Sequence, residues 1–241
     1  SGEKSLRYGA TVDNVLAVKM VCSDGEEYLF SKLTEEELQT KKALENYEGD
    51  IYRRLGALVT ENLQLIMSSK PKVQKNAAGY DLWNIWNEEE KTFNIAKLIV
   101  GSQGTLGFVS SAILQLVDSP KFTKMIVLPI ENLSRLAEGV QDILSHGPEG
   151  LETYDNHTYD VVKVNMQLEA KQTNRVDGFN LVLIAQFAEN TQEETDVLAV
   201  RAVSDLKAKN FEAVIVEDSA EQDAHWAIRR ASYKLLKDHA P

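Results

Sequence analysis

The second half of this sequence alternates short apolar runs with long amphipathic stretches, and that alternation constrains the fold more than any other feature. Strands are expected at 125–130, 151–154, 180–188 and 212–217, and all of these short segments except 151–154 are largely apolar. The stretches between them have the periodicity of helices. Because the helices are long and the strands few, we expect an α+β sandwich with helices on one face of the sheet.

Capping residues indicate where these helices begin and end. Asn132 precedes a stretch whose apolar side chains recur on one helical face, and Gly147 stands where that helix would need a left-handed residue. Two further helices are expected to begin with capping boxes. These boxes pair Thr191 with Glu194, and Ser219 with Gln222.

The first half predicts a different arrangement, with strands joined by turns and two helices. Strands are expected at 15–22, 28–30, 95–100 and 108–117, and helices after the Thr34/Glu37 capping box and over 50–67. Pro120 then marks a boundary between two domains, 1–119 and 120–241.

Charge and composition limit the partners of the chain. The formal net charge of -11 at pH 7 argues against nucleic acid or an anionic membrane, because both attract basic patches. No window contains the roughly 20 uncharged apolar residues of a transmembrane helix. The single cysteine, Cys22, fits a reducing compartment and lies in an apolar run that predicts a buried strand position. We expect a cytoplasmic protein, either free or peripheral to the inner face of the membrane.

A glycine-rich loop follows the predicted strand 95–100. Gly101, Gly104 and Gly107 would let the backbone turn tightly and approach a ligand, and Ser102 and Thr105 add hydroxyl groups suited to phosphate or ribityl oxygens. The spacing is neither a Rossmann fingerprint nor a P-loop, and no helix follows to hold a phosphate. From the spacing alone, a structural turn and a ligand-binding loop are equally open.

The last predicted helix has two distinct faces. Trp226, Arg229 and Tyr233 form a stripe on the side opposite an apolar face. An arginine fork flanked by aromatic rings suits a carboxylate ligand. The alternative is a packed tryptophan beside an arginine in a surface ion pair. The apolar face consists of Ala224, Ile228, Ala231 and Leu235.

No pattern in the sequence predicts a metal centre. The four histidines are scattered without the i, i+4 helical spacing of a zinc site, and we expect each to be a surface residue. These histidines are His146, His157, His225 and His239. A nucleophile elbow of the G-x-S-x-G type is also absent from the sequence.

Taken together and in order, four segments resemble the vanillyl-alcohol-oxidase type of FAD-linked oxidases. The branch they resemble contains D-lactate dehydrogenase, the flavoprotein subunit of glycolate oxidase and D-2-hydroxyglutarate dehydrogenase. The resemblance is strong up to about Val117 and looser beyond it. The four segments are Ser5–Gly9, Asp24–Gly25, Lys75–Leu82 and Ile99–Gly107.

This resemblance implies FAD as the cofactor. It implies that 1–119 is the C-terminal part of an FAD-binding domain and that 120–241 is an α+β cap domain, truncated at its C-terminus. It places the glycine loop along the FAD, with Gln103 in place of the usual glutamate, and the segment around Asn76 near the cofactor. The expected cofactor contacts are Tyr8, Asn76, Gly79, Tyr80, Gly101, Ser102, Gly104, Thr105 and Gly107.

The resemblance also implies a substrate site in the cap. Trp226–Arg229 is similar to a Trp-x-x-Arg segment whose arginine grips the substrate carboxylate, which favours Arg229, with Trp226 and Tyr233, as substrate-binding residues. Leu151–Asp155 is similar to a cap segment that forms a structural strand. The implied reaction oxidises a small D-2-hydroxy acid, such as lactate, glycolate or 2-hydroxyglutarate, by hydride transfer to the flavin.

Parts of the implied active site fall outside this sequence. The family's histidine motif, which carries the proposed base, would follow Pro241, and its pyrophosphate loop would precede Arg7. We therefore expect the isolated chain to bind FAD weakly or not at all and to be inactive. The alternative is a flavin-free binding or structural module on the same scaffold. The acid oxidised, the electron acceptor and the oligomeric state, a homodimer being one option, stay open.

Overall fold

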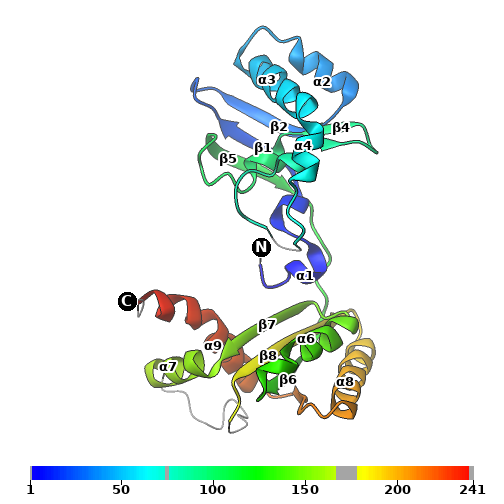
Figure 1. Ribbon diagram of the computed structural model, residues 1–241, viewed down its shortest axis with the longest axis vertical. Coiled ribbons are helices and arrows are strands. Elements are labelled where there is room, and N and C mark those ends of the chain that lie inside the picture. The colour runs from blue at the N-terminus through cyan, green and yellow to red at the C-terminus, as the bar shows by residue number, and fades with distance from the viewer. Residues whose placement is uncertain (1, 74–75, 167–177, 239–241) are drawn as a thin grey trace. The chain divides into compact units, whose positions relative to one another are not determined.

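The computed structural model describes residues 2–73, 76–166 and 178–238, which form two compact units (Figure 1). Unit 1 contains Gly9–Val117 together with Ser1–Gly2, and unit 2 contains Asp118–Pro241. The segment Glu3–Tyr8 packs with unit 2, although a boundary at Pro120 alone would assign it to the first domain.

Unit 1 is built on an antiparallel five-stranded sheet in the order β3-β4-β2-β1-β5. β1 and β2 form a hairpin that turns at Gly25, whose positive φ of 87° suits glycine. Cys22 is buried just after β1, as expected. The strands are β1 (Val15–Val21), β2 (Glu27–Thr34), β3 (Trp86–Asn87), β4 (Thr92–Asn94) and β5 (Phe108–Leu114).

Helices pack against this sheet around an aromatic core in which Tyr52 lies between Phe30 and Phe93. The predicted capping box is confirmed, because the Glu37 amide donates to Thr34 Oγ1 and the Thr34 amide donates to Glu37 Oε2. The helices are α2 (Glu35–Lys42), α3 (Tyr47–Glu61), α4 (Leu63–Ser68) and α5 (Ala96–Ile99), with 3₁₀ turns η1 (Thr11–Asp13) and η2 (Leu82–Asn84).

The strand predicted at 95–100 is wrong, because Ala96–Ile99 forms the short helix α5. Asn94 Oδ1 accepts a hydrogen bond from the Ala96 amide at 3.0 Å, which stabilises the turn that starts this helix. Ile95, Ala96 and Ile99 are buried in the core. A short apolar run has no periodicity that distinguishes a strand from a buried helical turn.

Unit 2 contains an antiparallel four-stranded sheet in the order β7-β8-β6-β9. The four strands predicted in this half of the sequence are all present. They are β6 (Phe122–Ile130), β7 (Gly150–Asp155), β8 (Leu181–Glu189) and β9 (Val214–Val216).

The α+β class is confirmed, but the expectation of helices on one face of this sheet is wrong. Ile126, Leu128 and Ile130 face α6 and α8, whereas Met125 and Val127 face α7 and α9. Residues 125–130 of β6 are therefore buried on both sides of the sheet, which explains why this part of the strand is apolar throughout. The helices are α1 (Ser5–Tyr8), α6 (Leu136–Ser145), α7 (Asn156–Met166), α8 (Gln192–Ala208) and α9 (Ser219–Asp238), with the 3₁₀ turn η3 (Leu133–Arg135).

The predicted helix caps in unit 2 have mixed outcomes. Thr191 caps α8 by accepting from the Glu194 amide, and Gly147 follows α6 with a φ of 69°. The Ser219/Gln222 box is wrong, because Asp218 Oδ1 accepts from the Ala220 amide at 3.1 Å. Aspartate one residue earlier caps as well as serine does. Asn132 caps the turn η3, which leads into α6.

Candidate functional site

The glycine loop of unit 1 adopts backbone conformations that are strained for residues with a Cβ atom. Gly101 and Gly104 have φ values of 94° and 77°, and a Cβ atom at either position would meet nothing within 4 Å. Gln103 between them also has a positive φ, of 56°. The loop therefore presents open backbone at both glycines, which is what a closely approaching ligand requires.

Gly107 is required for a different reason. A Cβ atom there would lie 2.7 Å from the Val21 carbonyl oxygen and 2.8 Å from Met20 Sδ. Glycine at this position lets the start of β5 lie directly against the end of β1. The structure thus supports a packing role for Gly107, whereas its expected contact with FAD stays a prediction.

The glycine loop lines a pocket of about 420 Å³ in unit 1. Its wall includes apolar side chains such as Val18, Ala112 and Leu114, from β1 and β5. Gly101, Ser102, Gly104 and Gly107 also line it, and Ser102 is buried. A mainly apolar wall beside open backbone fits a flat aromatic ring system, so these residues fit part of a flavin.

The second predicted cofactor segment meets the glycine loop directly. The Tyr80 and Thr105 hydroxyl oxygens are 2.8 Å apart, and Thr105 Oγ1 also donates to the Ser102 carbonyl oxygen. Asn76 Oδ1 accepts from the Ala78 amide and Gly79 has a φ of 72°, so a tight turn precedes Tyr80. The structure brings these predicted residues together at one edge of the loop.

Tyr8, the remaining predicted cofactor residue, packs within unit 2. Its hydroxyl donates to Glu149 Oε1 at 3.3 Å and lies 3.5 Å from the Asp118 carbonyl oxygen. Burial, together with the Glu149 carboxylate, raises the pKa of Tyr8 above its usual value. A contact between Tyr8 and FAD stays a prediction.

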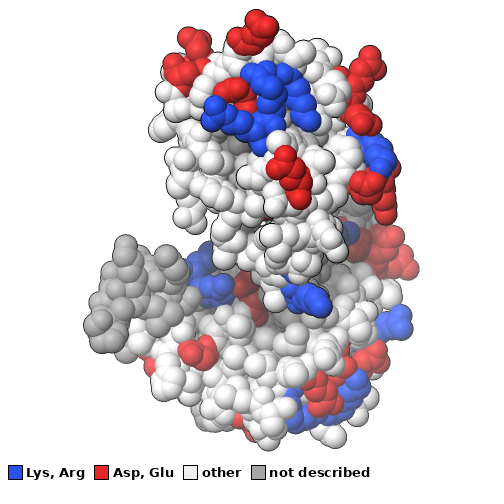
Figure 2. Space-filling view, turned by 45° about the horizontal axis from the view of Figure 1, so that its top comes forward, with Lys and Arg blue, Asp and Glu red and all other residues white. Residues whose placement is uncertain are grey.

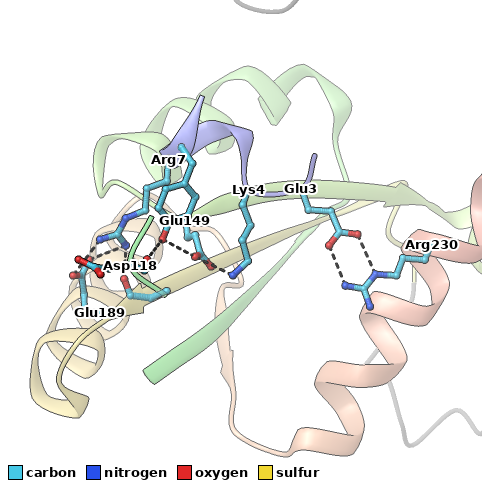
Figure 3. Close-up of polar contacts among 9 residues, drawn as sticks. Glu3, Lys4, Arg7, Asp118, Glu149, Glu189 and Arg230 are labelled. Atoms are coloured by element: carbon cyan, nitrogen blue, oxygen red, sulfur yellow. Dashed lines mark hydrogen bonds and ion pairs between the residues drawn. The ribbon is translucent and has the colours of Figure 1, made fainter. Parts of the chain in front are cut away.

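An ionic clasp, made by Glu3, Lys4 and Arg7, holds the segment Glu3–Tyr8 on unit 2 (Figure 3). The segment contributes one negative and two positive side chains, and each pairs with a side chain of opposite charge elsewhere in unit 2. Glu149 is the buried member, with a side chain that is 1% exposed. The pairs are Glu3 with Arg230, Lys4 with Glu149, and Arg7 with Glu189.

The predicted substrate residues lie on α9. Arg229 Nε donates to Glu152 Oε2 of β7 at 2.7 Å, which is the ion pair that the sequence left open as an alternative. Trp226 is partly buried and packs against the apolar cluster between the sheet and helices α7 and α9. The Arg230 guanidinium carbon lies 5.3 Å from the centroid of its ring. The Tyr233 side chain lies outside the described residues. Substrate binding by Arg229 stays a prediction.

Sequence reasoning missed a buried polar pair beside Arg229. His225 Nδ1 lies 2.9 Å from the Tyr154 hydroxyl oxygen, and the His225 side chain is 1% exposed. The expectation that every histidine lies on the surface is therefore wrong for His225. Burial lowers its pKa to about 4, so the imidazole is neutral at pH 7. Only the fold could reveal this pair, because Tyr154 is on β7 and His225 on α9.

Ion pairs also form on the surface of unit 1. Basic side chains gather over the end of unit 1 that carries α2 and α3 (Figure 2), where Lys41 pairs with Glu48, and Arg53 and Arg54 both pair with Asp50. Among the described residues, no group of three or more His, Cys, Asp or Glu side chains could hold a metal ion. The described helices also include none long and apolar enough to cross a membrane.

Solved structures of known proteins share this fold. The chain matches an alkyldihydroxyacetonephosphate synthase with a TM-score of 0.53 at 15% identity, covering 99% of this chain and 35% of that one. It matches 4-ethylphenol oxidase from Gulosibacter chungangensis with a TM-score of 0.50 at 10% identity, covering 97% and 42%. At these identities the likeness defines the fold alone.

Sequence comparison gives the family. Residues 119–241 match the FAD linked oxidases, C-terminal domain, and the chain belongs to this family. The chain is 26% identical to D-2-hydroxyglutarate dehydrogenase of Haemophilus influenzae, over 98% of this chain and 24% of that protein. It is also 26% identical to glycolate oxidase subunit GlcD of Bacillus subtilis, over 98% and 38%. The chain thus spans well under half the length of these two relatives, and the resemblance inferred from the sequence is confirmed.

Proposed function

We propose that this chain is part of an FAD-dependent enzyme that oxidises a small D-2-hydroxy acid. Unit 1 would supply one side of the flavin site, and unit 2 would be the substrate domain. The observation that carries the proposal is the glycine loop, which lines the pocket and also contacts the second segment predicted to bind FAD, through Thr105 and Tyr80. The family is FAD-linked, and its relatives named above act on 2-hydroxy acids.

The flavin, when bound, would accept a hydride from the α-carbon of the acid. The residues of unit 1 would bind and orient it. Gly101 and Gly104 leave the backbone accessible, and the apolar wall would exclude water from the ring. The Ser102 and Thr105 hydroxyls of the loop would contact polar atoms of the cofactor.

Arg229 would bind the carboxylate that all 2-hydroxy acids share. A guanidinium presents two parallel donors that match a carboxylate, which a lysine would not. The Arg229 side chain is 35% exposed, so a ligand can reach it although Glu152 already holds its Nε. This role suits lactate, glycolate and 2-hydroxyglutarate equally.

The single cysteine supports a cytoplasmic location.

The test uses the complete product of the gene that encodes this chain. Its intact mass and visible absorbance spectrum are measured together, and turnover of short D-2-hydroxy acids is followed with an artificial electron acceptor. We expect a flavin absorbance band and turnover, and we expect Arg229→Ala to abolish turnover while the flavin stays bound. A colourless protein, or an Arg229→Ala variant with normal turnover, contradicts the proposal.

A further inference from the structure

Two polar pairs join helix α9 to strand β7 within unit 2. Arg229 Nε donates to Glu152 Oε2 at 2.7 Å, and His225 Nδ1 lies 2.9 Å from the Tyr154 hydroxyl oxygen. The strand partners are two residues apart and therefore point to the same face of the sheet. The helix partners are four residues apart and therefore also share one face.

The spacing of the two pairs matches along both elements. Two strand residues span roughly 6.6 Å and four helical residues span roughly 6.0 Å, so both pairs form without distortion. Residue numbers increase in opposite directions along the two elements: the lower-numbered strand residue, Glu152, contacts the higher-numbered helix residue, Arg229, and Tyr154 contacts His225. α9 therefore lies antiparallel to β7, and the two pairs together fix its rotation and its position along the strand.

Glu152 is the less exposed member of its pair. Its side chain is 15% exposed, against 35% for Arg229, so its carboxylate lies toward the sheet and the guanidinium lies toward solvent. A partly buried, charge-assisted hydrogen bond is stronger than one on the open surface. Because the bond is made to Nε, it restrains the side-chain torsions that set the plane of the guanidinium.

The adjacent arginine provides a comparison. Arg230 pairs with Glu3, but the two side chains are 62% and 39% exposed. This pair is bidentate, with Arg230 Nε and Nη2 both donating to Glu3, but solvent screens it more than the pair of Arg229 and Glu152. Helix α9 thus carries Arg229, which is paired with a strand residue, and Arg230, which is paired with a more exposed residue.

We propose that Glu152 is a positioning residue that holds Arg229 in the orientation in which it binds the carboxylate of a 2-hydroxy acid. This inference rests on the proposed function of Arg229. Glu152 would not touch the substrate. It would reduce the conformational entropy that Arg229 loses when the substrate carboxylate binds.

The experiment compares three variants of the flavin-loaded complete gene product. Glu152→Gln keeps the shape but removes the charge, Glu152→Asp keeps the charge on a shorter side chain, and Glu3→Gln removes the partner of Arg230. We expect Glu152→Gln to raise KM for the D-2-hydroxy acid about tenfold with kcat within about twofold. Glu152→Asp should recover part of that loss, and Glu3→Gln should change KM less than Glu152→Gln does.

Flavin content and the midpoint of thermal unfolding are measured for each variant, so that a loss of folding is not mistaken for a loss of binding. An unchanged or lowered KM in Glu152→Gln overturns the inference, and so does an equal rise in Glu3→Gln. If Glu152→Gln does not fold, Glu152→Asp decides, because a KM equal to that of the wild type contradicts positioning by Glu152. A wild-type protein without flavin or turnover overturns the proposed function as well.

Discussion

The Tyr80 hydroxyl and the Thr105 hydroxyl lie 2.8 Å apart and join two segments that are far from each other in the sequence. Thr105 also donates to the Ser102 carbonyl oxygen, so Tyr80 is the donor to Thr105. This link attaches the turn at Asn76–Tyr80 to the glycine loop. The position of the turn relative to the glycine loop therefore depends on these two side chains.

Removing this link should loosen the loop. We expect Tyr80→Phe and Thr105→Val each to lower the free energy of unfolding of unit 1 by about 1 kcal/mol, and the double variant to lose less than the sum. Urea denaturation of the single and double variants measures the coupling. Strict additivity would show that the two hydroxyls do not interact.

The glycines of the loop should differ in their response to alanine. Gly104→Ala should cost about 1–2 kcal/mol, because its φ of 77° is unfavourable for a residue with a Cβ atom although the space is open. Gly107→Ala should cost more, because the new Cβ would overlap the Val21 carbonyl oxygen. Urea denaturation ranks the two variants, and the reverse order would contradict this account of the loop.

The stability of unit 2 should fall at mildly acidic pH because of His225. Its folded pKa of about 4 lies below the unfolded value near 6.5, so only the unfolded chain binds this proton between those pH values. The stabilisation is fully present above pH 6.5 and is lost as the pH falls toward 4. We expect this residue to contribute a loss of about 2 kcal/mol between pH 7 and pH 5.

This prediction is checked by urea denaturation at several pH values for the wild type, His225→Phe and His157→Asn. His225→Phe should reduce the pH dependence, whereas His157→Asn, at an exposed position, should preserve it. Equal pH dependence in the wild type and His225→Phe would show that His225 is not the titrating group.

The ionic clasp on Glu3–Tyr8 should depend mainly on its buried member. Lys4→Met removes the ammonium that pairs with the buried Glu149 carboxylate, and we expect it to lower the free energy of unfolding of unit 2 by about 1–3 kcal/mol. Glu3→Gln breaks an exposed pair and should cost less than about 1 kcal/mol. Denaturation at low and high salt measures both variants, and a larger effect of Glu3→Gln would contradict the assignment.

Much of the fold is predictable from the sequence because burial leaves a local pattern. β1 and β8 are largely apolar, and Thr34 and Thr191 cap helices through glutamates three residues later. The failures occur where two structures share one pattern. The apolar run that contains α5 is also compatible with a strand. The apolar run of β6 predicts a buried strand but does not predict that helices cover both faces of the sheet.

The sequence predicts which residues belong to the candidate sites, but it does not predict how they contact one another. Gly101, Gly104 and Tyr80 stand out in the sequence, yet only the folded chain places Tyr80 on Thr105. The ion pair between Arg229 and Glu152 joins residues 77 positions apart, and nothing local in the sequence couples them. Long-range pairs of this kind depend on sheet order and helix packing, which short-range patterns do not determine.

We propose that this chain contributes to flavin-dependent oxidation of a D-2-hydroxy acid. The most direct measurement mixes the flavin-loaded complete gene product, under anaerobic conditions, with the D- and L-forms of lactate and 2-hydroxyglutarate and with glycolate, while the flavin absorbance band is recorded. We predict that the band bleaches with glycolate or with the D-form of a chiral acid, and that Arg229→Ala prevents the bleaching. A flavin band that no 2-hydroxy acid changes would contradict the account.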